Sequence, residues 1–437
     1  MENKGHGLKK FLLAGILVVL LLPLVQQHVK MFESKPLKGF AVPKEQAFFT
    51  MGQWWDGRYQ LRYEEWYNEN FGFRNALVRV HNQLAYSLYD EAKAVDVITG
   101  KENYLYEYNY IKAYTGIDFI GYPAMQMTVD RLKTLQDSME KQNITLIVCL
   151  APGKASFYPE YIPDSYGPAS DSTNYLVMAK MLSGKGVNTI DYNKWFMDMK
   201  PKSEFLLYPR TGIHWSRYGS TMALDSLIRY VEHKRNVDMP GIIWERTILS
   251  DSLREPDEDI SLAMNLIWPI KPDPMGYPVY HFEDTTGKAK VSMMAISDSY
   301  FWSIFDVGLA PKSFSDIDFY YYFKEVHHTD GSPMSMASNE TAIEDASGHQ
   351  VVMLMCTEAN AWGLGWGFID CAYDHFVSHR MIDPKDKLVQ AYENSIRMNE
   401  KWMQDIRKKA QENGVPLDSM IHMDAVYMAE QEMLKKQ

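Results

Sequence analysis

The feature that most constrains the fold is a series of short, continuous apolar runs separated by segments with helical spacing. Runs of this kind are typical of strands buried on both faces, as in parallel sheets covered by helices. The sequence therefore predicts an α/β fold with a mostly parallel sheet. The predicted strands are residues 144–150, 187–192, 290–297, 316–323 and 351–356.

The segments between these runs predict the helices. Residues 127–142 place Val129, Leu132, Leu135 and Met139 on one helical face. Ser216 is a residue type that caps helix N-termini, and it precedes a helical pattern that continues to about residue 233. Further helices are predicted at 54–69, at 171–182, at 300–307 and in a stretch that ends near residue 89.

The composition supports a large folded domain and argues against one class of partner. The chain has 437 residues, of which 46% are hydrophobic and 13% aromatic, enough for a substantial core. Its net charge is −11, and no basic stripe interleaved with aromatic residues is present. Nucleic acid is therefore not an expected partner.

The first residues predict a targeting element. Lys4, Lys9 and Lys10 precede an uncharged apolar run over residues 11–25, the pattern of a Sec-type signal. No small-x-small cleavage pattern follows the run. We expect residues 1–26 to be an uncleaved anchor in the cytoplasmic membrane, which leaves the rest periplasmic or otherwise extracytoplasmic; a cleaved signal is the alternative. Residues 27–50 then predict a polar, extended stalk.

The remainder divides into an α/β domain over residues 51–383 and a charged helical extension over residues 384–437. In the extension, Trp402 and Ile406 suit an apolar stripe that packs on the domain. The aromatic residues of segment 54–67 suit either sugar stacking or a core face. The three cysteines are widely spaced, and we expect them to be core residues rather than disulfide or metal ligands: Cys149, Cys356 and Cys371.

Ser299 is the candidate nucleophile. An apolar strand leads directly into Asp298-Ser299 and a helix follows, so the turn would expose the serine oxygen beside backbone N–H groups. Serine needs an adjacent base at neutral pH, and His214 is the candidate. In such sheets, sites form beyond the carboxyl ends of strands, where Ser299, Lys154 and residues 357–360 are expected.

The carboxylate that should orient His214 is missing from its usual place. Two and three residues upstream the chain has Gly212 and Thr211, and loss of this acid costs about 10⁴-fold in a well-studied triad. Three alternatives remain open. A backbone carbonyl holds the imidazole, catalysis is lost, or a carboxylate comes from elsewhere, the candidates being Asp191, Glu204 and Glu358.

Several segments together resemble the alginate O-acetyltransferase branch of the SGNH hydrolase-like superfamily. His214-Trp215 resembles the end of its D-x-H-W segment, which precedes the serine block as it does here. Asp298-Ser299 resembles the Gly-Asp-Ser block, with Ser297 in place of glycine. The N-x-x-F-x-F-R, G-x-x-x-W-L and P-x-K…Y-P-E segments find counterparts at 68–75, 100–105 and 148–163. The resemblance extends over about residues 50–360.

This resemblance implies a flavodoxin-like α/β/α domain and acetyl transfer to, or removal from, an extracytoplasmic polysaccharide. Ser299 would attack an acetyl ester, with His214 as general base and an acyl-serine intermediate. A membrane-bound O-acyltransferase is the implied partner, and no cofactor is expected. The alternative from another class is a polysaccharide-binding or assembly protein that has kept the fold and lost catalysis.

The sequence also suggests secondary site residues. Lys154, Glu358, Asn360 and Trp215 are predicted to contact substrate, with solvent exposure of the lysine and helix capping by residues 358 and 360 as the alternatives. The histidine pairs 327/328 and 375/379 suggest metal ligands, but no third ligand follows at a suitable spacing. The sequence therefore predicts no metal site.

Overall fold

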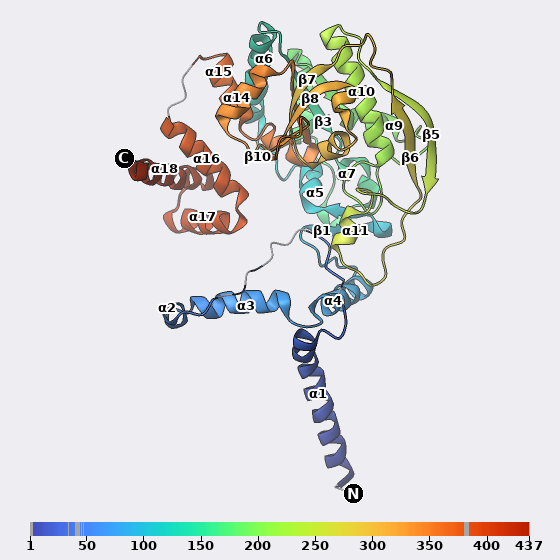
Figure 1. Cartoon of the computed structure of the whole chain (residues 1–437), viewed down its shortest axis with the longest axis vertical. Helices are drawn as coiled ribbons and strands as arrows, with labels where there is room; N and C mark the ends of the chain where they lie inside the picture. The colour runs from blue at the N-terminus through green and yellow to red at the C-terminus, as the bar shows by residue number, and fades with distance from the viewer. Residues whose placement is uncertain are drawn as a thin grey trace.

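The computed structural model describes residues 3–33, 35–39, 44, 46, 48–379 and 384–436. At its centre is a seven-stranded sheet made of β3 (Thr145–Ala151), β4 (Thr189–Asp191), β7 (Val291–Ser297), β8 (Phe314–Tyr321), β9 (Glu325–His328), β10 (Ser335–Met336) and β11 (Val351–Thr357). The strand order is β10-β9-β8-β7-β11-β3-β4 (Figure 1). The strands from β8 to β4 are parallel, and β9 and β10 pair antiparallel at one edge. The predicted mostly parallel sheet is confirmed.

Helices cover both faces of this sheet, which gives three layers. Along β11, Val351, Met353 and Met355 face one apolar cluster, and Val352 and Leu354 face the other. This alternation explains why the strands are apolar at every position. The first cluster includes α5 (Tyr108–Thr115), α9 (Tyr192–Met199), α10 (Arg217–Arg235) and α12 (Trp302–Phe305); the second includes α6 (Tyr122–Glu140), α8 (Asn174–Lys185), α14 (Asn339–Gly348) and α15 (Phe368–Phe376).

Several local features predicted from the sequence are confirmed. Ser216 caps α10, its Oγ accepting a hydrogen bond from the Gly219 N–H at 3.0 Å. The four predicted apolar residues of α6 are all fully buried. The three cysteines are free and buried, as expected. Short helices follow the strands at the carboxyl edge: α7 (Lys154–Phe157), η2 (Pro159–Tyr161), η3 (Asp164–Tyr166), η4 (Ser299–Phe301) and η5 (Glu358–Gly363). A further short helix, α13 (Leu309–Lys312), directly precedes β8.

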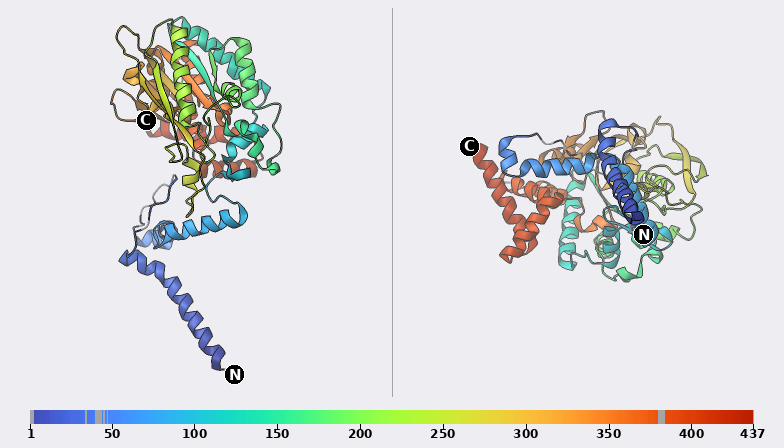
Figure 2. Two further views of the ribbon diagram at one scale, coloured as in Figure 1. Left: turned by 90° about the vertical axis from the view of Figure 1, so that its right-hand side faces the viewer. Right: turned by 90° about the horizontal axis from the view of Figure 1, so that it is seen from below.

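An antiparallel hairpin that the apolar pattern did not predict lies outside the main sheet. It consists of β5 (Ile242–Ser250) and β6 (Met275–Phe282) and packs beside α10 (Figure 2). The connection between its strands contains the short helix α11 (Asp259–Ala263). A second small hairpin joins β1 (Val97–Thr99) and β2 (Leu105–Glu107) around η1 (Lys101–Asn103).

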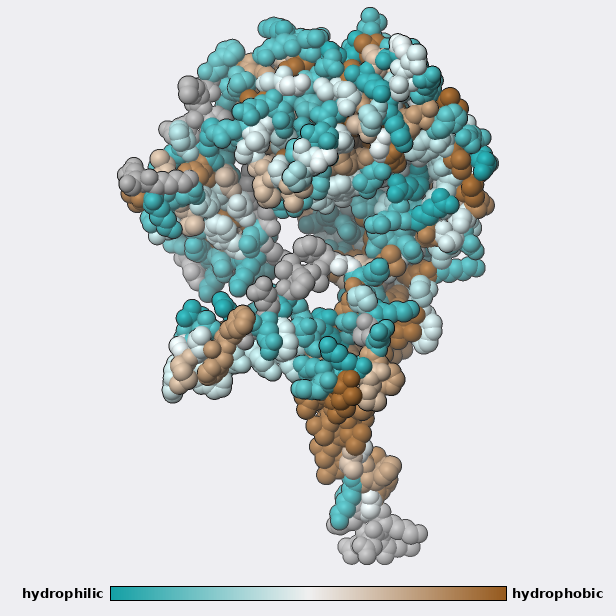
Figure 3. Space-filling view, in the orientation of Figure 1, coloured by the Kyte–Doolittle hydropathy of each residue, from teal (hydrophilic) through white to brown (hydrophobic). Residues whose placement is uncertain are grey.

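The N-terminal helix α1 (Asn3–Val29) projects away from the domain and has an apolar surface (Figures 1 and 3). Within the described residues it is the one helix whose length and composition would allow it to cross a membrane, with a hydropathy of 2.3 over Gly7–Val29. The helices α2 (Met51–Trp55), α3 (Arg58–Asn70) and α4 (Arg74–Tyr89) follow. No residue of α2 or α3 is buried, so their aromatic residues are not a core face.

The C-terminal segment folds into three helices: α16 (Pro384–Met398), α17 (Glu400–Asn413) and α18 (Leu417–Lys436). The predicted helical extension is interrupted at Asn399, whose side chain accepts a hydrogen bond from the Trp402 N–H. Ile406 and Trp402 belong to an apolar cluster made within these helices. The prediction that they pack on the α/β domain is therefore wrong.

Candidate active site

Ser299 lies at the carboxyl end of β7, in the sharp turn that the sequence predicts. The turn is held by the buried carboxylate of Asp298, which accepts hydrogen bonds from the N–H groups of Tyr300 at 3.1 Å and Thr357 at 2.8 Å. One bond closes the turn and the other ties it to the end of β11, the neighbouring strand. Asp298 thus fixes the position of Ser299, which is partly exposed.

His214 contacts Ser299 directly, although 85 positions separate them in the chain. The His214 Nε2 and Ser299 Oγ atoms lie 2.8 Å apart, within hydrogen-bonding range. The histidine belongs to the loop between α9 and α10, immediately before the Ser216 cap. The structure therefore brings together the two residues that the sequence singled out as nucleophile and base.

Asp259 supplies the carboxylate that the histidine segment lacks. Its Oδ2 lies 2.5 Å from His214 Nδ1, and its Oδ1 accepts hydrogen bonds from the N–H groups of Ile213 and Ile260 at 2.9 and 2.8 Å. One carboxylate oxygen is thus held by the backbone while the other meets the imidazole. Because the ring nitrogens face different partners, a proton on Nδ1 leaves Nε2 free to accept the serine proton.

The carboxylates named from the sequence do not take this position. Asp191 accepts hydrogen bonds from the Tyr175 hydroxyl and the Lys194 N–H. Glu358 accepts them from Ser156 and Asn193, and Glu204 is exposed. The hypothesis of a carboxylate from elsewhere holds, but the residues proposed for it are wrong.

Gly212 has a steric reason to lack a side chain. A Cβ atom at this position would lie 2.9 Å from Asp259 Oδ1 and 2.8 Å from the Pro256 carbonyl oxygen. Both distances are shorter than real Cβ contacts allow. Asp259 and the chain before it therefore occupy the space into which an acid at position 212 would project.

The electrostatic surroundings of His214 favour its protonated form. Burial opposes the charge, but the carboxylates of Asp259, Glu107 and Asp298 outweigh this effect and raise the pKa of His214 above its ordinary value of 6.5. A raised pKa strengthens His214 as an acceptor of the serine proton, and the imidazolium can return that proton to a leaving group.

The Lys154 side chain holds the backbone of the loop that carries His214. Its Nζ donates hydrogen bonds to the carbonyl oxygens of Arg210 at 2.8 Å and Gly212 at 2.5 Å. The side chain has no exposed surface, and burial lowers its pKa to about 7. This placement corrects the predicted contact with substrate, because a fully buried amine that is bonded to two carbonyls cannot reach a polysaccharide.

Tyrosine hydroxyls connect the loops around the site. The Tyr300 hydroxyl donates to the Ile213 carbonyl oxygen at 2.6 Å, and the Tyr208 hydroxyl donates to the Pro152 carbonyl oxygen at 2.7 Å. The two hydroxyl oxygens are 3.1 Å apart. This network joins the turn after β7, the histidine loop and the end of β3, and it fixes their relative positions.

The other three predicted substrate contacts also have structural partners. Trp215 is fully buried and donates its indole N–H to Ser303 Oγ at 2.5 Å, which rules out contact with a bound sugar. Glu358 is 4% exposed and is held by Ser156 and Asn193. Asn360 donates its amide to Asp298 Oδ2 at 2.8 Å and so supports the serine turn.

Two residues of the site were missed at the sequence level. Asp259 lies 45 positions after His214, in an acidic stretch without a motif, so no local spacing links it to the histidine. Tyr322 follows β8 with a left-handed backbone (φ 50°), and its hydroxyl lies close enough to the Ser299 side chain to interact with it. Burial raises the pKa of Tyr322, which keeps the phenol neutral and able to donate beside the nucleophile.

Comparison with known proteins gives a family match for part of this site. Residues 97–241 match the model of the SGNH hydrolase-like domain of the acetyltransferase AlgX. The matched segment contains His214, whereas Asp259 and Ser299 lie outside it. The apolar strands β3 and β4 of the central sheet also fall within it.

The curated relatives and several of the solved structures with similarity to this chain are alginate O-acetylation proteins. Probable alginate O-acetylase AlgJ of Pseudomonas aeruginosa is 22% identical over 189 residues, which are 43% of this chain and 46% of that protein. AlgJ of Pseudomonas syringae is 23% identical over 175 residues, 39% and 42% of the two chains. The chain thus spans less than half the length of the curated relatives it matches. The O-acetyltransferase domain of Pseudomonas putida AlgJ superposes with a TM-score of 0.42 at 18% identity, covering 61% of this chain and 92% of that one.

Proposed function

We propose that this chain, which is similar to the SGNH hydrolase-like alginate O-acetyltransferases, transfers acetyl groups to or from a polysaccharide through an acyl-serine intermediate. The observation that carries the proposal is the continuous hydrogen-bonded series Ser299–His214–Asp259. An oriented carboxylate, a partly buried imidazole and a serine at a strand-to-helix turn are the parts that nucleophilic acyl transfer requires.

The first half-reaction forms the acyl-enzyme. His214 Nε2 takes the proton of Ser299 while Oγ attacks the carbonyl carbon of an acetyl ester. The resulting oxyanion lies within reach of donors at the turn, among which we include the neutral Tyr322 hydroxyl. The ester C–O bond then breaks, and His214 returns the proton to the departing alcohol oxygen. Asp259 stabilises the imidazolium that exists between these two proton transfers.

The second half-reaction releases the acetyl group. A sugar hydroxyl, or water in an esterase, attacks the acyl-serine carbonyl while His214 takes its proton. Collapse of the intermediate returns that proton to Ser299 Oγ and restores the starting state. The alternative, a binding or assembly protein without catalysis, loses its main support because the missing acid is supplied by Asp259.

We further propose that α1 anchors the protein in the cytoplasmic membrane with the α/β domain outside the cytosol. The lysines that precede the apolar run support this orientation. A membrane-bound O-acyltransferase would then supply acetyl groups from the cytoplasmic side.

An acetyl-ester assay tests the proposed chemistry. The full-length protein in detergent is expected to hydrolyse a chromogenic acetyl ester, and Ser299→Ala and His214→Gln to lower kcat/KM by roughly 10³-fold or more, down to the background. Rapid quenching should capture acetyl on Ser299, detected by peptide mass spectrometry.

Ser297→Ala is the matched control. This serine lies on the same strand, is fully buried and has a hydroxyl without a hydrogen-bond partner, so its removal should leave the rate unchanged. Equal background rates from the wild type and both site variants would refute the catalytic proposal and favour the binding or assembly alternative.

A further inference from the structure

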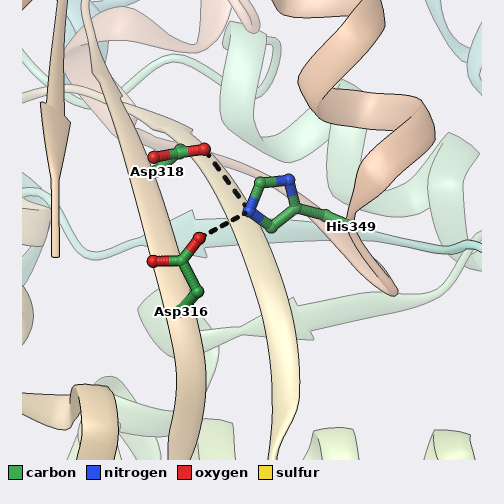
Figure 4. Close-up of side chains that lie close together, drawn as sticks. All are labelled: Asp316, Asp318 and His349. Carbon is green, nitrogen blue, oxygen red and sulfur yellow. Dashed lines mark ion pairs between the residues drawn. The ribbon is translucent and has the colours of Figure 1, made fainter. Parts of the chain in front are cut away.

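We propose that Asp316, Asp318 and His349 bind one divalent transition-metal ion such as Zn²⁺, at the edge of the sheet opposite Ser299 (Figure 4). Asp316 and Asp318 are two residues apart on β8 and so lie on the same face. His349 lies between α14 and β11, just before the first residue of that strand. Potential ligand atoms of the three side chains all lie within 4.8 Å of one another.

The histidine is prepared to act as a ligand. His349 Nδ1 lies 2.7 Å from the Asp345 carbonyl oxygen, which can only accept, so the ring carries its proton on Nδ1. The other nitrogen, Nε2, points at the two carboxylates. A backbone carbonyl on one imidazole nitrogen, with the lone pair of the other directed at the metal, is the usual outer arrangement of metal-binding histidines.

In each carboxylate, one oxygen has a hydrogen-bond partner and the other is left to bind the proposed metal. Asp318 Oδ1 lies 2.6 Å from His328 Nδ1, and Asp316 Oδ1 accepts a hydrogen bond from the Thr329 hydroxyl at 2.9 Å. The second oxygen of each, Oδ2, is the atom nearest to His349. Three ligands whose outer atoms are fixed while their inner atoms converge form a built site rather than a chance cluster.

The distances suit a metal better than a direct hydrogen bond. His349 Nε2 is 3.6 Å from Asp316 Oδ2 and 3.4 Å from Asp318 Oδ2, beyond the usual N–H···O range. Tetrahedral ligands that are each about 2.0–2.1 Å from zinc lie about 3.3–3.5 Å from one another. The two distances from the imidazole nitrogen to the carboxylate oxygens are therefore close to those expected around a central ion.

Burial and charge favour a cation at this point. Asp318 and His349 are each 8% exposed, and buried carboxylates need a partner or a metal. In the part of the chain that the structure describes, the ion-pair partners of Asp316 and Asp318 are only histidines. Two carboxylates and a neutral imidazole carry a charge of −2, which a divalent ion cancels. The Asp316 side chain, 39% exposed, leaves the site open to solvent on one side.

The ligand set also selects the class of metal. One imidazole nitrogen with two carboxylate oxygens suits first-row ions such as Zn²⁺, whereas Ca²⁺ and Mg²⁺ prefer oxygen alone. A water molecule would complete four-coordination. The bound ion would link β8 to the connection between α14 and β11. The sequence predicted no metal because these ligands follow no short spacing, and His328, noted there as a ligand, takes a supporting position instead.

Metal titration of the full-length chain tests the site. The protein in detergent is stripped with a chelator, then titrated with Zn²⁺ by calorimetry and with Co²⁺ by visible absorption. The wild type should bind one equivalent and unfold at a higher temperature when loaded. His349→Gln and Asp318→Asn should weaken Zn²⁺ binding at least about 100-fold, and His328→Gln about 10- to 100-fold.

His281→Gln is the matched control, since it removes an exposed histidine that also pairs with a carboxylate, Glu245. It should leave the affinity unchanged. No saturable binding by the wild type, or binding that the site variants do not weaken, would overturn the proposal. Should Asp318→Asn or His349→Gln fail to fold, the test rests on His328→Gln and on X-ray absorption of the loaded wild type. An all-oxygen or sulfur-containing shell there would also overturn it.

Discussion

Gly212 and Asp259 form a complementary pair at the scale of single residues. The glycine leaves free the volume in which the Asp259 carboxylate meets the imidazole, and a Cβ atom there would collide with it. The backbone N–H of Ile213, next to the glycine, donates to the same carboxylate. Gly212, which at first looks like the loss of an acid, is therefore required so that Asp259 can take the place of that acid beside His214.

Asp259→Asn should lower the esterase rate and change its pH dependence. The pKa of His214 is raised above 6.5 partly by Asp259, and the base must be neutral to act, so wild-type activity is lost as the pH falls through that raised value. Removing the charge should move the midpoint of the kcat/KM profile to lower pH and reduce the plateau roughly 10²- to 10⁴-fold.

Asp251→Asn, an exposed change in the same connection, is the control and should alter neither the midpoint nor the plateau. A profile with an unchanged midpoint in Asp259→Asn would contradict the assigned contact between the carboxylate and the imidazole.

At the scale of elements, the sheet could be predicted from the sequence because its strands are buried on both faces. Continuous apolar runs leave few alternatives for β3, β7 and β11, and Ser216 marked the start of α10. The hairpin of β5 and β6 was missed, since its strands are mostly partly exposed and give no continuous apolar run.

Some residues of the candidate site could also be predicted from the sequence, and others could not. Ser299 and His214 could be named because each stands in a recognisable local segment. Asp259 could not, since its role depends on how a connection outside the main sheet folds back against the histidine loop. Lys154 was expected near substrate because it follows a strand at the carboxyl edge of the sheet, but its amine donates instead to the carbonyl oxygens of Arg210 and Gly212.

Burial of Lys154 should make the free energy of unfolding depend on pH. The pKa of Lys154 is about 7 when folded against about 10.5 when unfolded, so the unfolded chain binds more protons between these values and stability rises with pH. This group alone should add about 2 kcal/mol to the free energy of unfolding between pH 7 and 9. Urea unfolding at the two pH values measures the gain.

Lys154→Met should show a gain smaller by that amount, because the variant has nothing to titrate there. It also removes a donor from the Gly212 carbonyl and should weaken the esterase by loosening the loop. Lys141→Met, on an exposed lysine, should keep the wild-type pH dependence. An equal gain in the two variants would contradict the burial of Lys154.

At the scale of the whole molecule, two parts have separate apolar clusters that stabilise them. The α/β domain has its two apolar clusters, one on each face of the sheet. The unit formed by α16, α17 and α18 has its own cluster and no residue in the other two. An ion pair between Lys387 and Glu340 links this unit to the domain, and exposed pairs of this kind contribute about 0–1 kcal/mol.

Removal of the C-terminal unit should therefore leave the active site intact. A chain that ends at residue 379 is expected to keep kcat/KM for the acetyl ester within about twofold of the full-length value, since no residue of the site lies beyond Asn360. Side-by-side assays at matched concentration check this. A tenfold loss, or failure of the shortened chain to fold by circular dichroism, would show that the domain depends on this unit.

The origin of the Asp259 carboxylate has a consequence for how inactive members of enzyme families are recognised. A sequence survey that looks for an acid two residues before the histidine would classify this chain as a pseudoenzyme, because it has glycine at that position. An imidazole responds to the negative charge nearest to it in space, whatever its distance along the polypeptide. When a relative lacks the acid at the usual motif position, its other loops should be searched for a carboxylate near the histidine before the protein is classed as inactive.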